Sequence, residues 1–317
     1  MADVRGLVKR GALLAAALLG LSQPSAALAE EAPRAAESST APRPAIWLIE
    51  DEDTKIYLFG TVHVFPASLE WRSQRLDQVI AEADELVMET PDASNAEMFD
   101  EDRMFAPMMM GKAVPILSRV SPRARPALRA ALESTGLPVE AYDEMHIWAV
   151  AFMLTGFQIA QGYGEEAGGQ AVALSGAEEV LGRIFRKSRR PIYGVETVEE
   201  QMRVFSTMPL DVQRRFLEAT VGDSDAPAPP VDPAAPSTDE DWVAGNVDAI
   251  AAEMRTMPAE IYEPLLTRRN RNWTQCLERR MARPGTVLFA VGAGHLAGPE
   301  SVQRMLAERG IMARRID

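Results

Sequence analysis

Two of the three histidines in the chain follow a glycine at the same spacing. His63 ends the sequence GTVH after the apolar run KIYLF, and His295 ends GAGH after the apolar run TVLFAV. Since glycine is about 7% of residues, this double spacing has odds of roughly one in two hundred by chance. A strand that ends in glycine and a sharp turn holds the next side chains over the carboxyl edge of a sheet, where open α/β sheets bind ligands. We therefore expect Gly60 and Gly292 to bring both histidines to one site.

Glu89 is the third candidate, because it ends the apolar run ELVM. In a parallel or mixed sheet its carboxylate would project from the same edge as the two histidines. Two imidazoles and one carboxylate are a common ligand set for a divalent metal such as Mn, Co, Zn or Fe, and equally a set for metal-free acid/base catalysis. A simpler interpretation is also open, in which the histidines bond to backbone and Glu89 is a surface residue.

The strands that must position these side chains are short and apolar. Residues 45–50 and 55–59 flank an acidic turn at 51–54, which predicts a β-hairpin. Further short strands are predicted at 85–89, 191–195 and 286–291. We therefore predict a mixed α/β fold with a small central mixed sheet that carries the two Gly-x-x-His turns at strand ends.

Helical patterns dominate the middle of the chain. Ser121-Pro122 is typical of a helix start, residues 147–160 form a long apolar helical pattern, and Thr197-Val198-Glu199-Glu200 is a capping box. Residues 258–281 predict one long helix. We expect this largely helical middle to cover the site and to set its specificity. His146 stands beside the apolar pattern and is interpreted as a packing residue.

The N-terminus has the three parts of an export signal. Basic residues come first, an apolar run follows at 12–21, and small residues precede the predicted cleavage after Ala29. About ten apolar residues are too few to cross a hydrocarbon core of roughly 30 Å. The pattern predicts a signal peptide over 1–29 and a periplasmic or secreted protein that keeps no stable membrane anchor.

Composition predicts how the mature chain is organised. Residues 30–45 are rich in Ala, Pro, Ser and Glu, which predicts a disordered leader, and residues 46–317 are predicted to form a single domain. Within that domain, the Pro/Ala-rich segment 226–236 is predicted to be a flexible insertion. The net charge of −13 argues against nucleic acid as a partner. Cys276 is the sole cysteine, so an intramolecular disulfide is excluded.

Five motifs give the chain a specific resemblance. GTVH, ELVMET, GVETVEEQ, LLTRRNRNW and VGAGHLAGPESVQRML occur in this order, as they do in the TraB/GumN family, which the chain resembles from Ile46 to Asp317. That family looks related to the TIKI proteases, which cleave Wnt proteins with metal help. More distant relatives are the erythromycin esterases and the ChaN-like haem-binding proteins.

The resemblance implies a site made of paired Gly-x-x-His motifs and an acidic residue. It assigns His63, His295 and Glu89 to that site, and it marks as further motif positions Glu196, Gln201, Arg269, Asn270 and Trp273. The family often has an aspartate after a glycine before the central helix. Here Gln170 is interpreted as occupying that place, which would be a departure from the family pattern.

These residues suggest a metal-dependent hydrolase, for which a peptidase is one option. His63, His295 and Glu89 would hold the divalent ion, Glu89 or Glu196 would move protons, and Arg269 would stabilise developing negative charge. Glu196 equally suits a capping role, and Arg269 equally suits a solvated helix face. The substrate, a peptide or a small molecule, is not named by the sequence. Two alternatives stay open: a non-catalytic protein that binds metal, haem or peptide, and a metal-free, esterase-like hydrolase with histidine as the general base.

Overall fold

The structure is a computed structural model that describes residues 41–90, 106–166, 172–222 and 238–317. The predicted signal peptide, most of the predicted leader, the insertion at 226–236 and Gln170 lie outside these residues, so what was expected of them stays a prediction. None of the helices in the described part combines the length and the apolar character needed to cross a membrane.

The described residues divide into two compact units. The first contains those within Glu97–Leu174 and Glu196–Ala235, and the second those within Ser22–Ala96, Ser175–Val195 and Pro236–Asp317. The second unit holds both Gly-x-x-His motifs, whereas the first is helical. The single domain over 46–317 stays a prediction.

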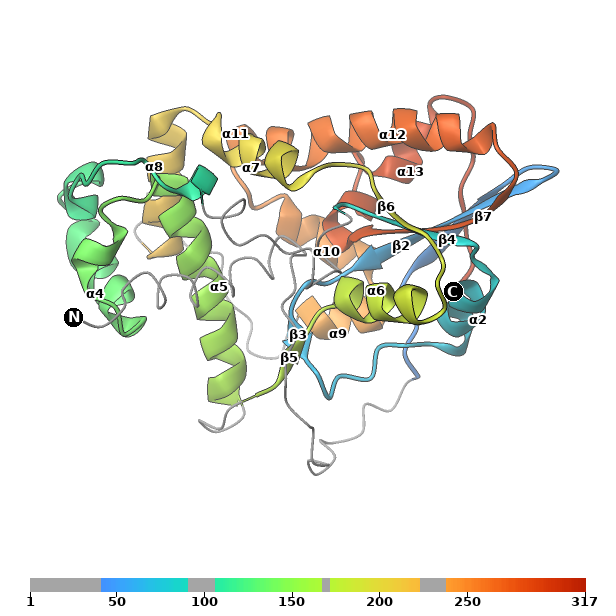
Figure 1. The fold of residues 1–317 in the computed structure, drawn as a ribbon, viewed down its shortest axis with the longest axis horizontal. Coiled ribbons are helices and arrows are strands. Elements are labelled where there is room, and N and C mark those ends of the chain that lie inside the picture. Colours follow the sequence, from blue (N-terminus) through green and yellow to red (C-terminus); the bar gives the residue numbers. More distant parts are fainter. Residues whose placement is uncertain (1–40, 91–105, 167–171, 223–237) are drawn as a thin grey trace. The chain divides into compact units, whose positions relative to one another are not determined.

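A six-stranded sheet forms the centre of the second unit, in the order β6-β4-β7-β2-β1-β8 (Figure 1). β7 pairs in parallel with both β2 and β4, and β4 with β6, whereas β1 is antiparallel to β2 and to β8. This arrangement confirms the predicted mixed α/β fold and the predicted hairpin. The strands are β1 Ile46–Glu50, β2 Thr54–Thr61, β4 Glu85–Met88, β6 Ile192–Gly194, β7 Gly285–Gly292 and β8 Arg314–Arg315. Two shorter strands are β3 Phe65–Pro66 and β5 Leu174–Ser175.

Both faces of this sheet are apolar, because alternate residues of each strand point to opposite sides. On one side Phe59 and Leu288 pack with α2, α6, α9 and α10. On the other side Leu58 and Phe289 pack with α12 and α13. The result is a three-layer arrangement with α12 and α13 above the sheet in Figure 1 and α2, α6 and α9 below it. These helices are α2 Gln74–Glu82, α6 Ala177–Lys187, α9 Thr238–Val243, α10 Val247–Met254, α12 Arg268–Met281 and α13 Val302–Ala307.

An aromatic cluster lies between the sheet and α9. The Trp242 ring lies 5.4 Å from the Trp71 ring and 5.5 Å from the Phe65 ring, measured between centroids. Its indole N–H donates to the Gly60 carbonyl at 2.8 Å. Trp242 therefore packs in the core and also holds the end of β2, where the first glycine motif begins.

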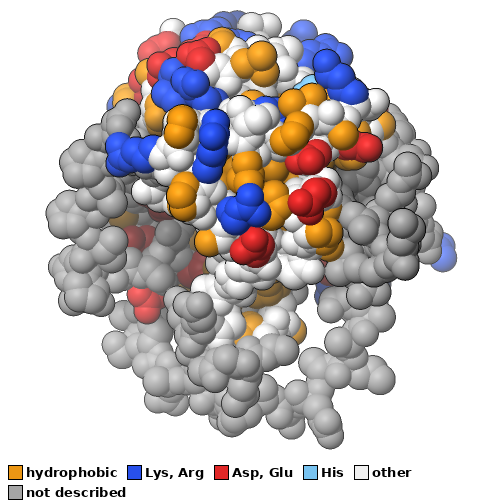
Figure 2. Space-filling model, turned by 90° about the vertical axis from the view of Figure 1, so that its left-hand side faces the viewer, with side chains coloured by type: hydrophobic (Ala, Val, Ile, Leu, Met, Phe, Trp, Pro, Cys, Tyr) orange, Lys and Arg blue, Asp and Glu red, His pale blue; other side chains and the backbone are white. Residues whose placement is uncertain are grey.

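The first unit is built from helices that pack through apolar and aromatic side chains. α5 packs on α8, and Trp148 of α5 stacks on Phe205 of α7 with ring centroids 5.7 Å apart. The capping box predicted at Thr197 is present at the start of α7. The helices are α4 Arg125–Ser134, α5 Ile147–Glu166, α7 Val198–Ser206 and α8 Leu210–Thr220, joined by single turns at Ala106–Met108, Ile116–Arg119 and Val139–Tyr142. Figure 2 shows basic, acidic and apolar side chains intermixed among the described residues on one face of the molecule.

Two helix predictions were wrong in detail, and proline explains both. The helix expected from Ser121-Pro122 begins at Arg125 instead, with Pro126 in its first turn. The single helix predicted over 258–281 is interrupted: α11 (Ala259–Tyr262) leads into a π-helical turn, Glu263–Thr267, before α12 begins. Pro264 has no N–H to donate and its ring crowds the carbonyl four residues earlier, so a regular α-helix cannot run through it.

Replacing Trp242 with Phe tests the anchor on β2. The variant keeps a large ring in the cluster but leaves the buried Gly60 carbonyl without the indole N–H, which should lower the free energy of unfolding by about 1–3 kcal/mol. Urea denaturation followed by far-ultraviolet circular dichroism measures this. Leu210→Ala, at a side chain that is 70% exposed, is the control and should change stability by less than about 0.5 kcal/mol. Equal stability of Trp242→Phe and the wild type would rule the anchor out.

Candidate functional site

The two glycine motifs lie side by side because β2 and β7 are neighbours. Their parallel register pairs Gly60 with Val291 and Thr61 with Gly292, so both strands end at the same level. A Cβ on Gly60 would lie 3.0 Å from the Cα of Ala293, and this close approach of the two turns requires glycine. The predicted convergence of the two motifs is therefore present in the fold.

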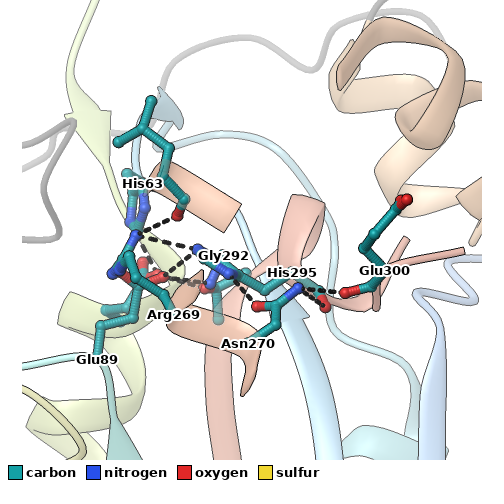
Figure 3. A network of polar contacts seen from close by, with 10 residues as sticks. His63, Glu89, Arg269, Asn270, Gly292, His295 and Glu300 are labelled. Atoms are coloured by element: carbon teal, nitrogen blue, oxygen red, sulfur yellow. Dashed lines mark hydrogen bonds and ion pairs between the residues drawn. The ribbon is translucent and has the colours of Figure 1, made fainter. Parts of the chain in front are cut away.

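Glu89 lies at the same edge of the sheet as the two glycine motifs, at the end of β4, which pairs with the other side of β7. β4 pairs Met88 with Ala290, and Glu89 follows directly. Its side chain is buried, with Oε1 accepting from the Gly292 N–H at 2.8 Å and Oε2 accepting from Arg269 Nη2 at 2.5 Å (Figure 3). Both carboxylate oxygens thus have partners, one of them a full positive charge.

His295 is held by α12 in one orientation. The Asn270 amide nitrogen donates to the carbonyls of His295 and Glu300, so its Oδ1 faces His295 Nδ1 at 2.6 Å and accepts the proton that this nitrogen carries. His295 Nε2 is then the unprotonated nitrogen, and Arg269 Nη1 donates to it at 3.2 Å. The imidazole also packs on Trp273, with ring centroids 4.3 Å apart.

The guanidinium of Arg269 affects the pKa of both His295 and Glu89. Burial and then the neighbouring guanidinium lower the pKa of His295 to about 3, so this imidazole is neutral. Burial alone would raise the pKa of Glu89, but above all Arg269, together with His63 and the Gly292 N–H, holds that pKa well below its usual range. The centre of the cluster is therefore a carboxylate, a guanidinium and a neutral imidazole that share hydrogen bonds.

His63 is the more accessible member, with 20% of its side chain exposed. Its Nδ1 lies 2.8 Å from Glu178 Oε1, an ion-pair distance, although the N–H direction departs from that of a hydrogen bond. Burial favours the neutral ring, but the Glu178 carboxylate outweighs it and raises the pKa of His63 to about 9. A methyl group on Gly292 would lie 3.5 Å from Nε2, so this nitrogen faces Gly292. At neutral pH, His63 is therefore positively charged, whereas His295 is neutral.

Comparison with protein families gives one match, which covers most of the chain. The profile of the TraB/PrgY/gumN family matches residues 45–315. The chain belongs to the TraB/PrgY/gumN family. Comparisons with curated proteins and with solved structures find no match. The resemblance predicted from the five motifs is thus confirmed at the level of the family.

Glu178 was not predicted from the sequence as a site residue of this TraB/PrgY/gumN protein. The family pattern of an aspartate after a glycine before the central helix was assigned to Gln170, which lies outside the described residues. In the described part, Glu178 stands two places after Gly176, the N-cap of α6. The usable signal was a glycine two places before an acidic residue at the start of a helical pattern.

The donor set of this family member does not fit a divalent metal in this arrangement. Glu89 and His295 Nε2 direct their lone pairs to the Arg269 guanidinium, and Glu89 also accepts from the Gly292 N–H. A metal ion bound between Glu89 and His295 would have to displace the Arg269 guanidinium, which already donates hydrogen bonds to the lone pairs of both residues. No cluster of three His, Cys, Asp or Glu side chains suited to a metal is present in the part of the chain that the structure describes.

The remaining predicted positions are described by the helix and the unit to which each belongs. Glu196 directly precedes the capping box of α7 and belongs to the helical unit, as does the buried Gln201. His146 stacks on Trp148, with ring centroids 6.5 Å apart. Cys276 is half-buried on α12, with Arg279 Nη2 3.3 Å from its sulfur. A catalytic role for Glu196 stays a prediction.

Gly292→Ala tests how closely the cluster is packed. The added methyl would lie 3.1 Å from Glu89 Oε1 and 3.6 Å from His295 Cδ2, so Glu89 must move and its ion pair should weaken. We expect a loss of about 1–3 kcal/mol in urea denaturation. The matched control is Gly162→Ala in α5, where a Cβ meets nothing within 4 Å; it should be neutral or more stable by up to about 1 kcal/mol. Equal effects of the two substitutions would contradict the packed cluster.

The charge of His63 predicts a pH dependence of stability. Because its pKa rises from 6.5 in the unfolded chain to about 9 in the fold, the stability it contributes is complete below pH 6.5 and is lost as pH rises through about 9. Unfolding free energies from pH 6 to 10 should therefore fall less steeply for His63→Asn than for the wild type. His146→Asn is the control and should keep the wild-type slope. Parallel curves for wild type and His63→Asn would disprove the raised pKa.

Proposed function

We propose that this protein is a hydrolase in which His63 accepts a proton from the attacking water and Arg269 stabilises the negative charge that develops. The observation that carries the proposal is the pairing of an accessible imidazole with a buried, preorganised charge cluster. The His63 side chain is part-exposed and its Nε2 faces Gly292, whereas Glu89, Arg269 and His295 lie buried beside it. An accessible general base and a fixed positive charge near it are two groups that accelerate hydrolysis.

Arg269 is supported as the electrostatic element by its fixed position. Its guanidinium contacts Glu89, His295 and the Leu265 carbonyl, and it lies 4.7 Å from the centre of the Trp273 ring. A cation held by four neighbours needs little reorganisation when charge develops near it.

Substitution of His63 tests the base. We expect His63→Ala to lower kcat by about 10²–10⁴-fold, and kcat/KM of the wild type to rise with pH up to about 9, since the neutral imidazole is the working form and the pKa of His63 is about 9. p-Nitrophenyl acetate and fluorescently labelled casein serve as ester and peptide probes. His146→Ala, which alters the histidine of the helical unit, should keep full activity. Hydrolysis that survives in His63→Ala would reject this role.

Metal content separates this proposal from metal-assisted hydrolysis. A methyl on Gly292 would lie near two donor atoms, Glu89 Oε1 and His63 Nε2, and near the carbon Cδ2 of His295; for His295 Nε2 and both Glu89 oxygens to bind an ion, Arg269 would have to leave. We expect negligible Mn, Co, Zn or Fe by elemental analysis and unchanged turnover after chelation. A His63→Ala/His295→Ala variant that is folded by circular dichroism is the control. Near-stoichiometric metal in the wild type and none in the variant would favour the metal-assisted form instead.

A further inference from the structure

The first turn of α6 lies directly against the turn that carries His63. The Ala177 N–H donates to the Val62 carbonyl at 3.0 Å, and a Cβ on Gly176 would collide with the carbonyl oxygen of His63. Glycine at the N-cap therefore lets the helix start approach the GTVH turn at backbone distance. This contact fixes where the next residue of α6, Glu178, can reach.

Glu178, in the first turn of α6, is 97% buried, and its carboxylate faces His63. Its Oε1 accepts from the Thr61 hydroxyl and lies 2.8 Å from His63 Nδ1. Its Oε2 is buried without a hydrogen-bond partner. Burial of an ionised carboxylate is costly unless an opposite charge or donors compensate it. Among the contacts that Glu178 makes, the His63 ring supplies that charge.

We infer that Glu178, held by Thr61, is a positioning residue that fixes the His63 ring with Nδ1 protonated and Nε2 turned toward Gly292. Without a carboxylate 2.8 Å from Nδ1, the ring could rotate or carry its proton on Nε2, the nitrogen that must be free to take a proton. The orientation of the ring is independent of what the site does. Its effect on turnover rests on the proposed hydrolase function.

The ring orientation can be measured without any substrate. The chain has three histidines, so ¹⁵N NMR signals of the imidazoles are assigned by replacing each one in turn. At pH 10, above the His63 pKa of about 9, the ring is neutral and holds one proton, and we expect Nδ1 to have the ¹⁵N shift of a protonated nitrogen in the wild type and that of an unprotonated nitrogen in Glu178→Ala. Glu178→Gln keeps an acceptor oxygen and should retain the protonated shift in a large part of the molecules.

Glu179→Gln is the matched control. Glu179 is the next residue of α6 and pairs with Arg183 on the same helix, so removing its charge should leave the His63 signals unchanged. Circular dichroism verifies that each variant is folded, and Glu178→Gln, the least disruptive change, serves if Glu178→Ala does not fold. An unprotonated Nδ1 in the wild type would overturn the inference. A protonated Nδ1 in folded Glu178→Ala, or an unprotonated one in Glu178→Gln, would overturn it as well.

Turnover supplies the second readout. With p-nitrophenyl acetate, Glu178→Ala should lower kcat by about 10²-fold with little change in KM, because the base is misplaced while the binding surface remains. Glu178→Gln should recover part of this loss. If the NMR result holds but neither wild type nor variants hydrolyse the probes, the hydrolase proposal fails and the positioning of His63 stands. If kcat is unchanged in Glu178→Ala, the positioning role in turnover is refuted.

Discussion

The parallel pairing of β2 with β7 is the constraint on which the site depends. It joins residues 54–61 to residues 285–292 in a fixed register, so two turns from distant parts of the chain end at one level. β4 then pairs with the free side of β7 and delivers Glu89 to the same edge. Helices on both faces cover the apolar sides of these strands, which a largely parallel sheet requires. Each site residue is therefore placed by rigid backbone rather than by a long loop.

The site also depends on charge compensation, because the charged side chains of Glu89, Arg269 and Glu178 are buried. Glu89 is compensated by Arg269, and Glu178 by His63, whereas burial and the neighbouring Arg269 keep His295 neutral. Removing one partner of such a pair leaves an uncompensated charge, which is more damaging than replacing both. The residues thus depend on one another for stability as well as for orientation. Such mutual dependence is common where perturbed groups gather at a functional site.

The sequence predicted the parts of the site that are local in the chain. Strand-glycine-histidine segments have a short-range pattern, and so do the hairpin, the capping box at Thr197 and the strand before Glu89. Glu178 was not predicted, because its importance comes from a contact with His63 more than a hundred residues away. The same holds for the partnership of Arg269 with Glu89: a row of arginines on a helical pattern does not show which one turns inward. Pro264 indicated an interruption of the helix predicted over 258–281, but proline alone does not specify a π-helical turn.

The central place of β7 has a consequence for how the protein is made. Its neighbours β2 and β4 are synthesised early, yet they have no common partner until residues 285–292 have left the ribosome. A nascent chain that ends before this strand can form the hairpin of β1 and β2 but cannot bring His63 and Glu89 to one edge. Contacts across such long stretches of sequence also form slowly. The arrangement delays assembly of the charge cluster until late in synthesis, so the growing chain carries no preformed site.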